Sequence, residues 1–503
     1  MESHPDFEAF KTLYDNGQAQ VVWTTLVADL ETPVSAFLKI ADSKPNSFLL
    51  ESVEGGAIRG RYSFIGMKPD VIWRCFGNKA EVNRRALVDT HHFEQSDKPT
   101  LESLKDLTES SRIDLPSHLP PMAAGIFGYM SYDTVRLVEN LPNVNPDALN
   151  VPDGIFVRPT IIAVFDSIED IVTIVTPVRP DSEISALAAY ETAMDRLADV
   201  RNDFARALSH DAPAHADDIE WPEPVSNMEP DAYKSMVAKA KDYILAGDIF
   251  QVVLSQRFEV PFDLPPFALY RALRRTNPSP FLFYLNFKDF AVVGSSPEVL
   301  VRLRDGKVTI RPIAGTRPRG ATPEEDNALA ESLLADPKEC AEHLMLLDLG
   351  RNDVGRVAKT GTVKVTDQFI IERYSHVMHI VSNVEGEISE DYDALKALMA
   401  GFPAGTVSGA PKVRAMEIID ELESEKRGIY AGCIGYFGAD GAMDTCIALR
   451  TAVVKDNKMY VQAGAGIVAD SDPESEHQEC RNKARALVRA AQEAVRFATS
   501  RSN

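Results

Sequence analysis

The feature that most constrains the fold is a stretch near the middle of the chain, residues 210–230, which contains four prolines and no hydrophobic periodicity. Such a stretch is typical of a connection between folded parts, because proline interrupts helices and central strands. The whole chain has 503 residues, more than one hydrophobic core usually holds. We therefore predict an N-terminal region, residues 1–225, and a second domain, residues 226–503.

Strand and helix patterns are mixed before this boundary. Runs of β-branched and aromatic residues predict short strands there, and one long segment has the pattern of a helix. The predicted strands cover residues 47–53, 71–74, 154–165 and 171–178, and the predicted helix covers residues 184–208.

Helices and strands also alternate after the boundary. A helix over residues 231–246 ends at Gly247, a natural residue just past a helix, and a strand follows over 249–260. The last helix covers residues 474–498, and no repeat of fixed length is present. We predict an α+β fold, with a large antiparallel or mixed sheet layered with helices and an N-terminal part interwoven with it.

The charge balance argues against some classes of partner. The chain has 53 Lys and Arg against 75 Asp and Glu, a net charge of −22. Nucleic acids and anionic membranes are bound by clustered Lys and Arg, so we expect neither as a partner. The five cysteines form no CxxC pair, and no segment is apolar enough for secretion or membrane spanning. A cytoplasmic protein is expected.

Three glutamates have the spacing of a site for a hard cation. Glu476, Glu479 and Lys483 lie at i, i+3 and i+7 on the last predicted helix and therefore share one face. Glu342 lies in a second helical run. Mg²⁺ takes oxygen ligands from one or two carboxylates and keeps waters that a substrate carboxylate can displace. Taken alone, the pattern also fits a solvated face of an acidic protein.

A glycine-rich segment, residues 464–469 (GAGIVA), matches the G-x-G-x-x-A pattern of dinucleotide-binding loops. That pattern requires a helix to begin at once, but Asp-Ser-Asp-Pro follows at residues 470–473. We favour a turn at the end of a strand. A further interpretation is that its backbone N–H groups receive a carboxylate. Residues 405–412 (GTVSGAPK) lack the spacing of a nucleotide-binding P-loop.

One histidine, His379, lies in a hydrophobic run. A lone histidine is commonly a hydrogen-bonded core or surface residue. A neutral imidazole is nevertheless a versatile general base near pH 7, so His379 remains a candidate for proton transfer.

Several long motifs in fixed order make the chain similar to a known family. Between about residues 231 and 491 it resembles the chorismate-binding enzymes, and along its whole length it is similar to the large subunits of anthranilate synthases. A weaker match covers residues 49–52 (LLES) and 60–63 (GRYS). The main motifs are residues 312–320 (PIAGTRPRG), 342–353 (EHLMLLDLGRND), 405–412 and 464–483.

The resemblance implies a Mg²⁺-dependent lyase of tryptophan biosynthesis. In such an enzyme ammonia adds to the ring of chorismate as the ring hydroxyl leaves, and pyruvate is then eliminated to leave anthranilate. The resemblance assigns Glu298 as the acid for the hydroxyl, and His379 with Thr406 to the elimination. The resemblance also implies that Glu342 and Glu479 bind Mg²⁺, with Glu476 close by. The implied substrate-binding residues are Gly315, Thr316, Tyr430, Arg450, Gly464, Ala465, Gly466 and Lys483.

Position 314 separates the relatives. Relatives that add water, or that form aminodeoxychorismate through an enzyme-bound adduct, resemble one another in having lysine there, whereas this chain has Ala314. A methyl group is neither base nor nucleophile, so an external nucleophile, ammonia, is expected. No cysteine motif of a glutaminase is present. We therefore expect a separate glutamine amidotransferase subunit, in a heterotetramer of two large and two small subunits.

The resemblance also implies feedback inhibition by tryptophan. Its pocket would lie where the N-terminal region, residues 1–225, meets the catalytic domain, residues 226–503. Without the resemblance, residues 277–282 would be interpreted as a loop between a helix and a strand. The implied pocket residues are Leu50, Glu51, Ser52, Asn277, Pro280, Phe281 and Leu282.

The sequence disfavours three alternatives. The aminodeoxychorismate synthase large subunit of folate synthesis is disfavoured by Ala314. A non-catalytic tryptophan-sensing scaffold is disfavoured by the presence of Glu342, Glu479, His379 and Arg450. A nucleotide-binding oxidoreductase is disfavoured because no helix follows the glycine-rich segment directly.

Overall fold

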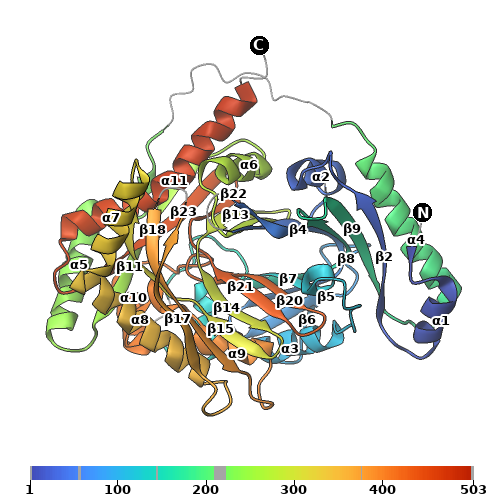
Figure 1. Cartoon of the computed structure of the whole chain (residues 1–503), viewed down its shortest axis with the longest axis horizontal. Helices are drawn as coiled ribbons and strands as arrows, with labels where there is room; N and C mark the ends of the chain where they lie inside the picture. Colours follow the sequence, from blue (N-terminus) through green and yellow to red (C-terminus); the bar gives the residue numbers. More distant parts are fainter. Residues whose placement is uncertain are drawn as a thin grey trace.

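The computed structural model describes residues 3–42, 44–54, 58–142, 145–208, 222–374 and 377–499. Much of the predicted boundary, residues 209–221, lies outside the described residues. Within them, every strand pair is antiparallel and the strands join one hydrogen-bonded network. Helices lie around it, with α1, α2 and α4 at one end and α5, α7, α8 and α10 at the other (Figure 1).

The helices have these bounds: α1 (Phe7–Asp15), α2 (Pro33–Ile40), α3 (Thr100–Ser110), α4 (Ala186–Phe204), α5 (Pro230–Leu245), α6 (Pro266–Thr276), α7 (Pro323–Leu334), α8 (Pro337–Gly355), α9 (Ala394–Gly401), α10 (Lys412–Leu422), α11 (Pro473–Thr499), and the short 3-10 helices η1 (Pro121–Ala123), η2 (Tyr132–Leu137) and η3 (Gly405–Val407).

The strands have these bounds: β1 (Ser3–His4), β2 (Gln20–Val27), β3 (Ser47–Glu54), β4 (Ile58–Phe76), β5 (Lys79–Asn83), β6 (Glu94–Gln95), β7 (Gly125–Met130), β8 (Gly154–Asp166), β9 (Ile171–Val178), β10 (Val225–Ser226), β11 (Gln251–Pro261), β12 (Phe281–Asn286), β13 (Ala291–Ser296), β14 (Val299–Arg304), β15 (Lys307–Ile310), β16 (Ile313–Pro318), β17 (Lys364–Arg373), β18 (Val377–Glu387), β19 (Gly409–Ala410), β20 (Cys433–Gly438), β21 (Met443–Ile447), β22 (Thr451–Lys455) and β23 (Lys458–Ile467).

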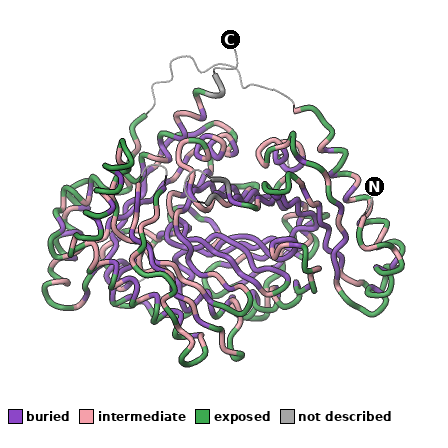
Figure 2. The backbone as a smooth tube through the Cα atoms, in the orientation of Figure 1, coloured by how far each residue is buried: buried purple, intermediate pink, exposed green. Residues whose placement is uncertain are grey.

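Alternation along the strands separates the three largest hydrophobic cores of the described residues. In β4, Phe64 and Ile72 face an aromatic core between two sheet layers, while Ile65 faces a second core and Trp73 a third. The second core packs under α1, α2, α4, α6 and α11, and the third under α3, α5, α8, α9 and α10. The predicted layering of helices on a large sheet is therefore confirmed, and Figure 2 shows the buried strands at the centre.

Strands from the two ends of the sequence alternate in this network. β3 pairs with β12, so that Ser52 lies opposite Phe281, and β7 pairs with β20. Strands of the N-terminal region are therefore hydrogen-bonded to strands of the C-terminal part, which is the predicted interweaving.

Local structure agrees with most of the predicted elements. The predicted helix over residues 231–246 is α5, and Gly247 follows it with φ +84°. The predicted strand over residues 171–178 is β9, with the same bounds. The short run at residues 71–74 is only the end of β4, which continues past Lys68 at φ +49° and a bulge near Pro69.

The glycine-rich segment corrects one prediction. Gly464, Ala465 and Gly466 lie inside β23 and pair with β11, so no turn is formed there. The sequence pattern is misleading because glycine is also used in strands where another group approaches closely. A Cβ on Gly464 would lie 2.8 Å from the Tyr430 hydroxyl oxygen.

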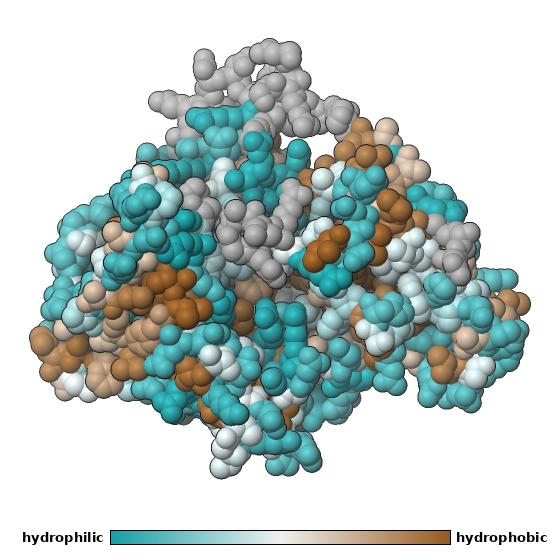
Figure 3. All heavy atoms as spheres, in the orientation of Figure 1, coloured by the Kyte–Doolittle hydropathy of each residue, from teal (hydrophilic) through white to brown (hydrophobic). Residues whose placement is uncertain are grey.

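Surface properties fit the composition. Hydrophilic side chains cover much of the face drawn in Figure 3, between scattered hydrophobic patches. In the described part of the chain, no helix combines the length and hydrophobicity needed to span a bilayer.

Candidate active site

Glu298 is a buried carboxyl group at the turn between β13 and β14. Its side chain accepts a hydrogen bond of 3.0 Å from the Thr406 hydroxyl of η3. Burial raises the pKa of Glu298 from 4.5 to about 8, although the bonds from Thr406 and from the Ile313 backbone act in the opposite direction. Glu298 is therefore protonated at neutral pH and can donate a proton.

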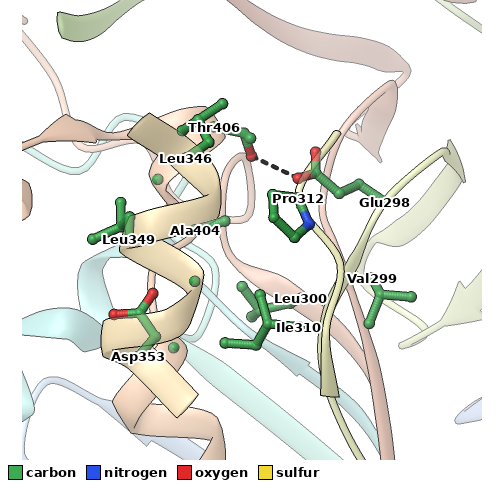
Figure 4. A pocket seen from close by; sticks show the side chains of 13 residues that line it. Glu298, Val299, Leu300, Ile310, Pro312, Leu346, Leu349, Asp353, Ala404 and Thr406 are labelled. Carbon is green, nitrogen blue, oxygen red and sulfur yellow. Dashed lines mark hydrogen bonds between the residues drawn. The ribbon is translucent and has the colours of Figure 1, made fainter. Parts of the chain in front are cut away.

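A small pocket extends from Glu298 along helix α8. Figure 4 shows Glu298 and Thr406 at one end and Asp353 at the other, with apolar side chains between them. This lining contains no cation that would stabilise a carboxylate at position 298, which explains why burial dominates its pKa. The apolar side chains are Val299, Leu300, Ile310, Pro312, Leu346, Leu349 and Ala404.

His379 lies on β18, opposite Thr316 of β16. Its Nδ1 is 2.9 Å from the Gly315 carbonyl oxygen, which can only accept, so Nδ1 carries the proton and Nε2 keeps its lone pair. Gly315 has φ +67°, a backbone conformation that favours glycine. Burial lowers the pKa of His379, and the charges of Arg450 and Lys483 act in the same direction. A neutral imidazole can act as a base here.

Two cations lie near His379. Arg450 is half-buried, with φ +46°, and burial lowers its pKa. Its Nη1 is 3.4 Å from the Ser279 hydroxyl, a weak contact. Lys483 of α11 donates to the Gly464 carbonyl over 2.9 Å and pairs with Glu479 at 2.7 Å.

The backbone of β23 faces the same region. Tyr430 accepts a hydrogen bond from the Gly464 N–H. Gly466 lies two residues further along the strand, so its N–H points to the same side. Ala465 points the other way, and its methyl group is buried in the third core. The structure therefore brings Tyr430, Gly464 and Gly466 to the site but turns the Ala465 side chain away.

The three predicted metal-binding glutamates lie on two helices. Glu342 is on α8 and accepts a 2.7 Å hydrogen bond from Gln251 Nε2, while Glu476 and Glu479 are on the first turns of α11. Burial raises the pKa of Glu342 and of Glu476, and the nearby charge of Glu479 raises both further. Among the described residues, no three His, Cys, Asp or Glu side chains form a ready metal cluster.

The two predicted halves of the tryptophan pocket meet across a strand pair. Glu51 of β3 lies opposite Leu282 of β12. Asn277 ends the preceding helix, and its Nδ2 is buried without a hydrogen-bond partner. Leu50 and Phe281 belong to the aromatic core, whereas Leu282 faces the opposite core. Ser52 packs closely on Gly60, where a Cβ would lie 2.1 Å from the Ser52 hydroxyl.

Sequence reasoning missed Gln251 and Tyr374. Gln251 binds Glu342 and has a buried Oε1 without a partner. The Tyr374 ring lies 5.6 Å from the His379 ring. The signal for Gln251 in the sequence is its position as a polar residue at the start of a hydrophobic strand. Its partner, Glu342, is 91 residues away in the sequence, so the contact itself gives no local pattern.

The family model described as chorismate binding enzyme matches residues 54–489. Anthranilate synthase component 1 of Cereibacter sphaeroides is 60% identical over 500 residues, covering 99% of each chain. The protein of the same name from Pseudomonas putida is 48% identical over 471 residues, covering 92% of this chain and 93% of the relative.

Solved structures share the fold. Anthranilate synthase component I from Streptococcus pneumoniae superposes with a TM-score of 0.74 at 36% identity, covering 92% of this chain and 98% of the other. The menaquinone-specific isochorismate synthase MenF of Escherichia coli has a TM-score of 0.71 at 20% identity, covering 96% and 99%. This second likeness concerns the fold alone.

Proposed function

The chain belongs to the chorismate-binding enzyme family, and we propose that it is the large subunit of an anthranilate synthase. It would convert chorismate and ammonia to anthranilate and pyruvate in tryptophan biosynthesis. The observation that supports this most directly is that β16 joins a neutral acid to a neutral base: the Ile313 backbone donates to Glu298, and Thr316 lies opposite His379. The charges of Arg450 and Lys483 act on His379.

Chorismate is a dicarboxylate, so an acidic protein has to neutralise it locally. Arg450 and Lys483 supply charge, and the Gly466 N–H supplies a further donor, while the Gly464 N–H holds the Tyr430 hydroxyl beside them. Gly315 and Thr316 would line the same space beside His379. Tyr430 presents a hydroxyl to the same strand edge, and burial raises its pKa, so it binds as a neutral phenol.

Each stage of the reaction requires a proton transfer. Glu298 holds a proton at neutral pH and would protonate the ring hydroxyl as the C–O bond breaks, leaving water and a carboxylate. Thr406 orients that carboxyl group. In the second stage His379 Nε2 would take the ring proton as pyruvate leaves, because its Nδ1 proton is already held by Gly315.

The nucleophile is external. Ala314 is paired with Ile380, directly after His379, and presents only a methyl group. Cys75, Cys433, Cys446 and Cys480 are buried, and burial raises the pKa of each thiol, so none resembles a glutaminase nucleophile. These features support ammonia as co-substrate and a partner glutamine amidotransferase that releases it. We propose an assembly of two large and two small subunits.

The predicted metal-binding glutamates of α8 and α11 are of the kind that Mg²⁺ takes as ligands. Glu342 and Glu479 would hold the ion, with Glu476 nearby, and the free Gln251 Oε1 beside Glu342 is an oxygen ligand of the kind Mg²⁺ prefers. When bound, the ion would hold the ring carboxylate and screen its charge.

Feedback control by tryptophan is part of the proposal. Residues 1–225 would be the regulatory region, and residues 226–503 the catalytic domain. The unpartnered Asn277 Nδ2 is a donor suited to the carboxylate of an amino acid, and Ser52 lies opposite Phe281. We propose that Leu50, Ser52, Pro280 and Phe281 line the pocket with Asn277. The five free cysteines are consistent with a reducing compartment, and we propose the cytoplasm.

One experiment tests the activity. The purified chain is incubated with chorismate and Mg²⁺, together with either ammonium or glutamine, and anthranilate is followed by its fluorescence. We expect product with ammonium and none with glutamine. Product from glutamine would contradict the need for a partner. An amino-substituted product that keeps its enolpyruvyl group would favour aminodeoxychorismate synthesis. Absence of any turnover would favour a non-catalytic sensor.

A further inference from the structure

The loop between α10 and β20 contains a fully buried ion pair that the proposed chemistry does not use. Glu423 ends α10, and Arg427 follows four residues later, with side chains only 4% and 1% exposed. Arg427 donates to both carboxylate oxygens of Glu423, over 2.9 Å from Nε and 2.6 Å from Nη2. This bidentate geometry fixes the plane of the guanidinium group.

The remaining hydrogen bonds of Arg427 reach two backbone segments beside the active site. Nη1 donates to the Val407 carbonyl over 2.7 Å, and Val407 directly follows Thr406, the partner of Glu298. Nη2 donates to the Val253 carbonyl over 2.7 Å, and Val253 lies opposite Gly466. One guanidinium group therefore joins the acid end of the site to its anion-binding strand.

Glu423 extends the same connection. Its Oε1 accepts from the Ser255 N–H over 2.8 Å and from the Ser255 hydroxyl over 2.9 Å. Ser255 lies opposite Gly464 in the β11–β23 pair. The Arg427 guanidinium also lies 5.6 Å from the centre of the Tyr430 ring, whose hydroxyl meets Gly464. Gly464 and Gly466 therefore lie opposite Ser255 and Val253, the two residues of β11 that hydrogen-bond to the Glu423–Arg427 pair.

A buried ion pair is a poor way to gain stability alone, because desolvating two charges offsets their attraction and a well-packed apolar pair often performs as well. Here the pair instead fixes geometry, because its backbone partners, Val407 and Val253, belong to two different segments, η3 and β11. We propose that Arg427, oriented by Glu423, is a positioning residue that sets the spacing of η3, β11 and Tyr430 around bound chorismate. This inference rests on the proposed function.

The test separates positioning from stability. In the double variant Glu423→Gln/Arg427→Met neither charge remains, so no unpaired charge is buried. In the single variant Arg427→Lys the positive charge remains, but the two parallel hydrogen bonds of the guanidinium group to Glu423 are lost. The matched control is Asp70→Asn/Arg158→Met, which removes a bidentate pair from the N-terminal region, with bonds of 2.8 and 2.9 Å. Thermal unfolding and ammonium-dependent kinetics are measured for all three and for wild type.

We expect the KM for chorismate to rise about tenfold or more in both Arg427 variants, in protein whose unfolding midpoint stays above the assay temperature. In the control the midpoint changes but KM does not. Wild-type KM and kcat in either folded Arg427 variant would overturn the inference, as would an equal rise of KM in the control. Absence of anthranilate from wild type would instead refute the proposed function.

Discussion

Two glutamates of this protein are equally buried yet face opposite surroundings. Glu51 and Glu298 are each 6% exposed. Glu51, in the predicted feedback pocket, accepts hydrogen bonds of 2.6 and 2.9 Å from Arg274 and a further bond from the Tyr270 hydroxyl. Glu298 receives one side-chain bond, from neutral Thr406. Burial alone does not decide the charge of a carboxyl group, because its partner matters as well: Glu51 is paired with a cation, whereas Glu298 has a neutral partner and keeps a proton that it can donate.

The sharpest test of this comparison is Glu298→Gln, which keeps the shape and removes the acid. We expect kcat to fall by about 10³-fold, the range of general acid catalysis. In wild type the rate should decline as pH rises through about 8, because Glu298 then loses its proton. Steady-state rates between pH 6 and 9.5 measure both effects. Near-normal activity would remove Glu298 from the chemistry.

The same pKa makes a prediction about stability. Between pH 4.5 and about 8 the folded chain holds a proton on Glu298 that the unfolded chain has lost. Wild type therefore loses stability relative to Glu298→Gln as pH rises through this window, by up to about 5 kcal/mol. Urea unfolding at pH 5 and pH 9 measures this difference. Glu51→Gln is the matched control: it should cost about 3 kcal/mol by leaving the Arg274 charge without its partner, yet keep activity in the folded protein.

A second carboxylate on the catalytic side is tested by Glu479→Gln. We expect activity to fall by about 10²-fold and the Mg²⁺ concentration for half-maximal rate to rise, because one anionic ligand is lost. Glu493→Gln is a control on the same helix, at a surface pair with Arg496. An unchanged Mg²⁺ requirement in Glu479→Gln would place the ion elsewhere.

His379→Ala should impair one stage more than the other. We expect pyruvate elimination to slow by at least about tenfold more than ammonia addition, since only the elimination uses the free Nε2. An amino-substituted, non-aromatic intermediate should then accumulate and be detectable by chromatography. If both stages slow equally and no intermediate forms, His379 only positions the substrate.

The smallest effect on activity is expected on the feedback side. Ser52→Phe should fill the corner beside Gly60 and Phe281 and exclude tryptophan, while the ammonia-dependent rate stays within about twofold of wild type. Activity is titrated with tryptophan for both proteins. Inhibition that is as strong in the variant as in wild type would move the feedback site elsewhere. A wild type that tryptophan does not inhibit would show that this chain lacks the control.

Local pattern predicted the elements more securely than their surroundings. The strand over residues 171–178 and the helix over residues 474–498 follow from local pattern alone, and both are found. The turn predicted at Gly464 failed because the group that requires glycine there, the Tyr430 hydroxyl, comes from elsewhere in the sequence.

The site shows the same limit. Family motifs identify Glu298 and His379 as candidates. No motif explains why Glu298 keeps its proton at neutral pH or shows that His379 carries its proton on Nδ1. Those properties depend on long-range neighbours: the apolar pocket around Glu298 and the Gly315 carbonyl beside His379. Distances in space, not spacing in sequence, decide both protonation states.

The pairing of β7 with β20 has a consequence for how the chain is made. β7 ends at Met130 and its partner begins at Cys433, so about 300 residues separate them. At a synthesis rate of about 5–20 residues per second, the N-terminal strands wait on the order of tens of seconds for this neighbour. Until then Phe127 and the other aromatic residues of the central core lack the side chains of β20, Ile434 and Tyr436, that pack in the same core. Folding of this protein is therefore expected to finish after release from the ribosome, and chaperones that shield nascent chains should matter most for its N-terminal half.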